Sequence, residues 1–178
     1  LVSPKLLKGS KGRLTADMIT ESINPDDIHR PKTRLVALEN TMNKGGGSVY
    51  DFKEIIKIAA VCKKNKLKLH LDGARLFNAL VESKETPSDY GTHFDTISIC
   101  FSKGLGAPVG SVLIGTKDAI IRGKRVRKAL GGGMRQAGYL AAACTYALDH
   151  HLDKIKDDHR RARILASAIE NLPFVSAI

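Results

Sequence analysis

The sequence predicts an α/β fold with a largely parallel sheet. Short apolar or alternating segments typical of strands recur along the chain, and segments with helical periodicity separate them. A parallel neighbour needs a long crossover connection, so this alternation favours a parallel sheet. The 178 residues and the hydrophobic content of 43% suit one domain with a sizeable core.

The first strand is expected at residues 34–38, where the letters RLVAL form a short apolar run. A helix is expected over 51–65, with Asp51 as its N-cap. Its apolar positions recur at helical spacing: Phe52, Ile55, Ile56, Ala59 and Cys62.

Residues 67–71 (LKLHL) alternate between apolar and polar side chains and predict a second strand. The chain then reaches Asp72-Gly73, after which residues 74–81 can form a helix. Residues 94–101 (FDTISICF) are rich in strand-forming side chains and predict a third strand.

A glycine-rich turn at 102–106 separates the third strand from another β-branched run at 109–114 (VGSVLI). From residue 117 onward the pattern is helical. The glycines at 131–133 interrupt this pattern, and Pro173 ends it.

Basic residues outnumber acidic ones by 29 to 18, which raises the question of a nucleic-acid partner. The basic runs at 63–68 and 122–128 contain no aromatic side chains that could stack on bases, so we expect no nucleic-acid partner. The longest apolar stretch, 138–148, is too short to span a membrane. A soluble protein without a membrane partner is therefore expected.

The three cysteines, Cys62, Cys100 and Cys144, lie far apart in apolar segments. This placement is typical of buried, reduced thiols in a cytoplasmic protein. The six histidines show no spacing typical of metal ligands, so we expect no metal site.

Unusual residues follow three of the predicted strands. Glu39-Asn40 comes after the first, Asp72 after the second and Lys103 after the third. Ligands of parallel α/β sheets bind beyond the carboxyl ends of the strands. The sequence therefore predicts a ligand site at this edge.

Lys103 lies in a turn of glycines and one proline (CFSKGLGAPVG, 100–110), directly after a predicted buried strand. An amine held beside apolar surface loses part of its hydration, which makes its neutral form available as a nucleophile or Schiff-base partner. The alternative is a surface lysine in a tight turn.

Asp72 ends an apolar strand at the rim of the sheet, and Gly73 leaves room there for a flat ligand. The carboxylate can pair with a cationic ring nitrogen, and Arg75 can offer a guanidinium fork to a substrate carboxylate. A compatible alternative is that Asp72 caps the following helix and pairs with Arg75.

A strand-end Asp72 and a strand-end Lys103 together form the arrangement that pyridoxal phosphate needs. The lysine binds the aldehyde of the cofactor, and the carboxylate keeps the pyridine nitrogen protonated so that the ring can accept electrons.

Four stretches of the chain carry a family resemblance: LVALENTMNKGGGSVYD (35–51), LHLDGARLFNA (69–79), FDTISICFSKGLGAPVGSVLIG (94–115) and RVRKALGGGMRQAGYLAAA (125–143). They resemble the low-specificity threonine aldolases, pyridoxal-phosphate lyases of the aspartate-aminotransferase-like fold. The resemblance implies a three-layer α/β sandwich with a mostly parallel sheet. Residues 1–150 would form the central and later part of the cofactor-binding large domain, and 151–178 a helix leading toward a small C-terminal domain.

The resemblance also implies roles for single residues. Lys103 would bind pyridoxal phosphate covalently, Asp72 would pair with its ring nitrogen, and Arg75 would bind the carboxylate of an amino-acid substrate. Arg135 resembles an arginine that reaches the cofactor phosphate across a subunit interface, which implies a homodimer or homotetramer. Asn40 would contact the ring substituents or orient its loop.

One position departs from the family pattern. Many members carry, after Glu-Asn-Thr, a histidine that reaches the hydroxyl of the substrate side chain, whereas this chain has Met42. A thioether cannot act as a general base. Either another residue takes the proton, or the reaction is not threonine cleavage. We favour a tolerated variant with shifted substrate preference, in which Met42 contacts the substrate.

The implied reaction is cleavage of L-threonine, or a related β-hydroxy-α-amino acid, to glycine and an aldehyde. β-Eliminating lyases and aminotransferases of the same fold share the lysine and the aspartate and are the alternative. A basic nucleic-acid-binding or structural protein is a more distant one. We also expect an incomplete chain, because the N-terminal region and the small C-terminal domain of the family have no counterpart in it.

Overall fold

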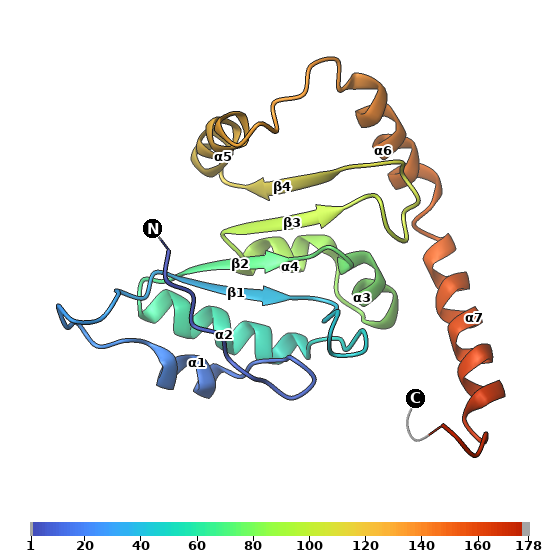
Figure 1. The fold of residues 1–178 in the computed structure, drawn as a ribbon, viewed down its shortest axis with the longest axis horizontal. Helices are drawn as coiled ribbons and strands as arrows, with labels where there is room; N and C mark the ends of the chain where they lie inside the picture. The colour runs from blue at the N-terminus through green and yellow to red at the C-terminus, as the bar shows by residue number, and fades with distance from the viewer. Residues whose placement is uncertain (1, 176–178) are drawn as a thin grey trace.

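The centre of the computed structural model, which describes residues 2–175, is a four-stranded sheet. Its strands lie side by side in chain order: β1 (Leu35–Glu39), β2 (Lys68–Asp72), β3 (Thr96–Cys100) and β4 (Ser111–Gly115). The first three are parallel, and β4 runs antiparallel to β3 (Figure 1). The predicted α/β arrangement with a largely parallel sheet is confirmed.

The register of the strands brings their carboxyl ends to one edge. Glu39 pairs with Asp72 across β1 and β2, and Asp72 pairs with Ser98 across β2 and β3. All three strands therefore end at nearly the same level, on the side where α3 and α7 lie in Figure 1.

Seven helices occur among residues 2–175: α1 (Ala16–Ser22), α2 (Phe52–Lys64), α3 (Leu76–Glu82), α4 (Pro87–His93), α5 (Lys117–Ala129), α6 (Gly138–His150) and α7 (Lys154–Ile169). The two connections between parallel strands place their helices on the same face of the sheet, as right-handed crossovers require. The rings of Phe52 in α2 and Tyr90 in α4 meet with centroids 5.0 Å apart. This face holds the main core, which includes Leu69, Leu71, Ile97 and Ile99.

Local capping explains where several helices begin. Asp51 caps α2 as predicted, because its carboxylate accepts a hydrogen bond of 2.9 Å from the amide of Lys53. Helices α1 and α4 were not expected from the sequence. A capping box between Thr86 and Asp89 starts α4, with a proline in its first turn.

The opposite face of the sheet is more open. The alternate side chains of β2 and β3 there are half-buried or exposed: Lys68, His70, Asp72, Thr96, Ser98 and Cys100. Strand β4 is exposed along its whole length, and Val112, Leu113 and Ile114 keep 43%, 44% and 47% of their surface accessible. Within residues 2–175, helices therefore cover one face of the sheet closely and the other only in part.

The helical region after residue 117 divides into three helices. The glycines at 131–133 separate α5 from α6, and a short turn after His150 separates α6 from α7. Helix α7 packs against α3. The division of the chain at residue 150 into two units stays a prediction.

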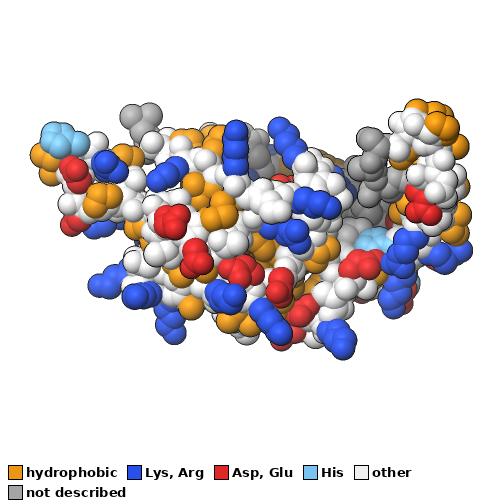
Figure 2. All heavy atoms as spheres, turned by 90° about the horizontal axis from the view of Figure 1, so that it is seen from below, with side chains coloured by type: hydrophobic (Ala, Val, Ile, Leu, Met, Phe, Trp, Pro, Cys, Tyr) orange, Lys and Arg blue, Asp and Glu red, His pale blue; other side chains and the backbone are white. Residues whose placement is uncertain are grey.

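The surface carries charges of both signs. Figure 2 shows acidic and basic side chains interspersed on the face seen from below. No helix within residues 2–175 is long and apolar enough to cross a lipid bilayer. All three cysteines are free; Cys62 is buried as expected, whereas Cys100 and Cys144 are only half-buried.

Candidate active site

Asp72 lies exposed at the carboxyl end of β2. Its backbone carbonyl accepts a hydrogen bond of 3.0 Å from the amide of Asn40, so the loop after β1 stays joined to this strand end. One carboxylate oxygen accepts a hydrogen bond of 3.1 Å from the amide of Ala74. The carboxylate is therefore oriented by the backbone while it remains open to solvent.

The alternative role of Asp72, as the cap of the following helix and the ion-pair partner of Arg75, is wrong on both points. Helix α3 begins at Leu76 with Arg75 as its N-cap, so Asp72 is not the cap residue. Asp72 and Arg75 also form no ion pair among the salt bridges of residues 2–175. Arg75 is half-buried. Its guanidinium forms no ion pair within residues 2–175, so it is available to a ligand.

Gly73 makes room for the protein itself rather than for a ligand. Its amide donates a hydrogen bond of 2.8 Å to the carbonyl of Ser98. A Cβ at Gly73 would lie 2.9 Å from that same carbonyl oxygen and 3.2 Å from the Cβ of Leu76. The glycine is therefore required by the close approach of β3 and α3, which corrects the expectation that it admits a flat ligand.

Lys103 occupies an exposed turn between β3 and β4. The turn is closed by backbone hydrogen bonds from Gly106 to Lys103 (2.8 Å), from Ala107 to Phe101 (3.0 Å) and from Phe101 to Gly110 (2.9 Å). Gly106 has a φ of +69°, which favours glycine at this position. The exposure of Lys103 does not provide the desolvation that the sequence suggested.

A second hydrophobic cluster anchors this turn. Phe101, Leu105 and Ala107 point inward and pack with Ala147 of α6 and Ile155 of α7. The turn also rests on α3, because a Cβ at Gly104 would lie 3.6 Å from the side-chain oxygen of Asn78. Lys103 thus faces solvent, whereas Phe101 before it and Leu105 after it are buried.

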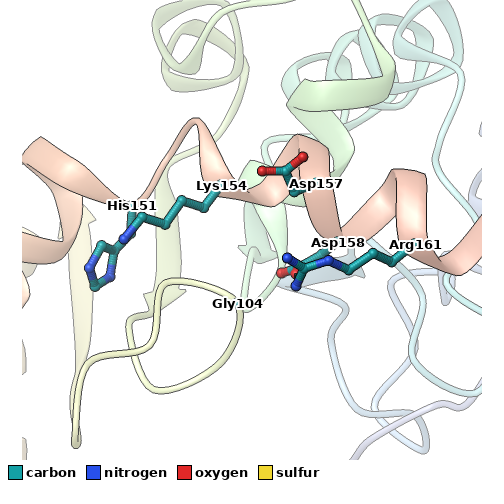
Figure 3. A pocket seen from close by; sticks show the side chains of 6 residues that line it. All are labelled: Gly104, His151, Lys154, Asp157, Asp158 and Arg161. Carbon is teal, nitrogen blue, oxygen red and sulfur yellow. The ribbon is translucent and has the colours of Figure 1, made fainter.

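A hollow of about 420 Å³ opens between the turn and α7 (Figure 3). It is lined by Gly104, His151, Lys154, Asp157, Asp158 and Arg161. Neither Asp72 nor Lys103 lines it, so this hollow borders the candidate site without being the place where both side chains meet.

Asn40 and Met42 are held by packing. The buried Asn40 donates a hydrogen bond of 3.0 Å to the hydroxyl of Tyr90 and accepts one of 3.2 Å from the amide of Tyr50. This favours loop orientation among the two roles expected for it. The half-buried Met42 packs against the main core, with its methyl group over Gly12. A contact of either residue with cofactor or substrate stays a prediction.

Arg135 lies apart from the other predicted residues. It is exposed in the connection between α5 and α6, on the far side of β4 from β1 and β2 (Figure 1). The structure therefore brings Asp72, Arg75, Asn40 and the turn of Lys103 to one edge of the sheet, and leaves Arg135 away from it.

The side chains at this edge suit pyridoxal phosphate chemically. An exposed primary amine can bind an aldehyde, an exposed carboxylate can pair with a protonated ring nitrogen, and a half-buried guanidinium can bind a carboxylate. The amine and the carboxylate come from adjacent parallel strands.

A polar cluster that the sequence did not reveal joins α3 to α7. Glu82 accepts hydrogen bonds from Nδ1 of His159 and, at 2.7 Å, from Arg163. The amide of Asn78 donates to Nε2 of His159 at 3.1 Å. Because these partners are 77 to 81 residues apart in the chain, no local pattern could have revealed the cluster.

Hydrogen bonding and burial shift two pKa values near this edge. Hydrogen bonds from His159 and Arg163 lower the pKa of Glu82, against a small opposing effect of burial. Burial, with the nearby charge of Glu85, raises the pKa of Tyr90 to about 12, although its hydrogen bond with Asn40 acts in the opposite direction. Tyr90 therefore stays neutral throughout the physiological range.

The chain is similar to several proteins named threonine aldolases. A probable low-specificity L-threonine aldolase 2 of Arabidopsis thaliana is 46% identical over 146 residues, which cover 82% of this chain and 41% of that protein. The low specificity L-threonine aldolase of Escherichia coli (strain K12) is 42% identical over 158 residues, 89% of this chain and 46% of the relative. A solved threonine aldolase structure from Leishmania major superposes with a TM-score of 0.83 at 26% identity, over 92% of this chain and 49% of that one.

The chain thus spans less than half the length of these relatives. The family model described as beta-eliminating lyase matches residues 2–177, nearly the whole sequence. This chain belongs to the beta-eliminating lyase family.

Proposed function

We propose that the protein cleaves the Cα–Cβ bond of L-threonine, or of a related β-hydroxy-α-amino acid, to glycine and an aldehyde, with pyridoxal phosphate as cofactor. The observation that carries the proposal is the placement of Asp72 and the Lys103 turn at the ends of neighbouring parallel strands. The relatives named low-specificity L-threonine aldolases support the choice of reaction.

Lys103 and Asp72 would divide the work at the cofactor. Lys103 would hold it through Nζ and, when the amino group of the substrate takes its place, would hold or move a proton at Cα. Asp72 would keep the proton on the ring nitrogen. Bound pyridoxal phosphate supplies an electron sink for the carbanion left at Cα.

Arg75 would orient the substrate by a two-pronged contact with its carboxylate. The proton of the β-hydroxyl must be taken by a group other than Met42, because a thioether has no basicity near neutral pH. Met42 would instead offer apolar contact to the substrate side chain, which shifts preference among β-hydroxy amino acids.

The active form would contain at least two copies. The connection between α5 and α6, which contains Arg135, lies beyond β4 from β2, so an arginine that reaches the cofactor phosphate from this connection would come from a second chain. The free cysteines of residues 2–175 suit a reducing compartment, which supports a cytoplasmic location.

Product analysis tests the reaction. The purified protein, supplied with pyridoxal phosphate and L-threonine, is expected to release glycine and acetaldehyde in equal amounts, and Lys103→Ala is expected to release neither. Ammonia and a keto acid would instead indicate β-elimination, the alternative on the same fold, and would contradict the proposed cleavage.

A further inference from the structure

The turn that carries Lys103 makes a polar contact with a distant part of the chain. Nδ1 of His151, in the junction between α6 and α7, donates a hydrogen bond of 2.7 Å to the backbone carbonyl of Leu105. The two residues are 46 positions apart. Figure 3 shows His151 at this junction, beside the turn that contains Gly104.

This contact adds a side-chain restraint to a turn that backbone hydrogen bonds from Gly106 to Lys103 and from Ala107 to Phe101 already close. Gly106 and Gly104 flank Leu105 and give the backbone wide conformational freedom. The carbonyl of Leu105 lies next to Gly106, so a donor there restrains a segment in which glycine adds backbone freedom. The restrained segment begins two residues after Lys103.

Burial of the Leu105 side chain supports the same restraint. Leu105 keeps only 3% of its surface accessible and packs in the cluster that contains Ala147 and Ile155. The thiol of Cys144 adds a weak contact of 3.4 Å with the carbonyl of Val109, at the other end of the turn. The junction of α6 and α7 therefore holds the turn by one strong hydrogen bond and by packing around it.

We propose that His151 is a positioning residue for Lys103: its hydrogen bond to Leu105 holds the turn in the conformation from which the Lys103 amine condenses with the cofactor aldehyde, a step that forms a C=N bond and releases the aldehyde oxygen as water. This inference rests on the proposed function, since it presumes that Lys103 is the reacting amine. His151 itself would contact neither substrate nor cofactor.

The test compares three variants that separate the donor from the ring. His151→Phe keeps an aromatic ring and removes the donor, whereas His151→Asn places an amide nitrogen where Nδ1 stands and keeps the donor. His150→Phe is the matched control, because His150 is the neighbouring histidine and is exposed. Its ring packs on Tyr146, with the two ring centroids 4.3 Å apart, and not on the turn.

Two readouts are measured on each variant. Borohydride reduction followed by peptide mapping gives the rate at which pyridoxal phosphate becomes attached to Lys103. Hydrogen exchange of the Gly106 and Ala107 amides reports the rigidity of the turn without any cofactor. In His151→Phe we expect attachment to slow, and exchange to quicken, by up to roughly tenfold, the largest factor that the net loss of one hydrogen bond gives.

His151→Asn is expected to restore most of both properties, and His150→Phe to match the wild type. Equal attachment and equal exchange in His151→Phe and the wild type would overturn the inference, as would a failure of the asparagine to restore them. If the wild type gains no cofactor at Lys103, the proposed function fails, while the exchange rates still decide whether His151 fixes the turn.

Discussion

The side-chain amide of Asn40 donates a hydrogen bond of 3.0 Å to the hydroxyl of Tyr90, fifty residues later in the chain. Both side chains are fully buried. The contact joins the loop after β1 to α4, and through Asn40 it reaches the amide of Tyr50 at the start of the segment that leads into α2. The strand end beside Asp72 is thereby fixed to the main core.

Removing the Tyr90 hydroxyl should weaken the fold measurably. Tyr90→Phe leaves the Asn40 amide buried without its acceptor, so we expect the free energy of unfolding to fall by about 1–3 kcal/mol. Urea denaturation at pH 7 measures this. Tyr139→Phe is the control, because Tyr139 is 89% exposed and its change should be neutral. Equal stability of both variants would contradict a structural role for the Asn40–Tyr90 pair.

The cluster of Glu82 with His159 and Arg163 should stabilise the protein only while Glu82 is ionised. Its pKa is lower in the folded state than in the unfolded chain, so this contribution is present above the unfolded pKa and is lost as the pH falls through the folded one. Glu82 is 41% exposed, which limits the contribution to about 0.5 kcal/mol.

Glu82→Gln tests this pH dependence. The variant should be less stable than the wild type at pH 7, and the difference should vanish once the pH falls below the lowered folded-state pKa of Glu82, where the wild-type carboxyl is protonated as well. Urea denaturation at several pH values gives the difference. A gap that persists unchanged in acid would show that the charge of Glu82 is irrelevant to the contact of α3 with α7.

Asp72→Asn should separate folding from chemistry. The amide oxygen of asparagine can still accept the hydrogen bond from Ala74, so the strand end should keep its conformation. The variant cannot hold a proton on the cofactor ring, and we expect turnover to fall by about two orders of magnitude. The cofactor should still become attached to Lys103, which borohydride reduction detects. Near-normal turnover would refute the role of Asp72.

The local signals of the sequence predicted those parts of the fold that local physics determines. Asp51 caps α2 where the pattern placed it, and the alternation of 67–71 marked β2 to within one residue. The capping box of Thr86 and Asp89 is also a local pattern, and it could have predicted the start of α4. The connection at 101–110 is too short for a parallel crossover, so the antiparallel direction of β4 was available from its length.

Contacts between distant segments could not be predicted in this way. The use of Gly73 depends on how closely Ser98 approaches it, and the support of the Lys103 turn depends on His151 in a later helix junction. The sequence could therefore predict Asp72 and Lys103 as site residues from their positions at the ends of strands. It could not show that the lysine is exposed, or which side chains hold its turn.

Mixing two inactive variants tests the shared site. If Arg135 serves the cofactor of a second chain, Lys103→Ala and Arg135→Ala each lack activity. A mixture of the two, refolded together, should regain roughly a quarter of wild-type activity, because half of the dimers then contain one complete site. A mixture without activity would contradict the contribution of Arg135 across an interface.

Peptide mapping after borohydride reduction shows directly whether Lys103 binds the cofactor. The protein is incubated with pyridoxal phosphate, reduced and digested, and the modified lysine is identified by mass spectrometry. We expect the pyridoxyl group on Lys103, and its loss from the corresponding peptide in Lys103→Ala. Modification confined to other lysines, or spread evenly among them, would contradict it.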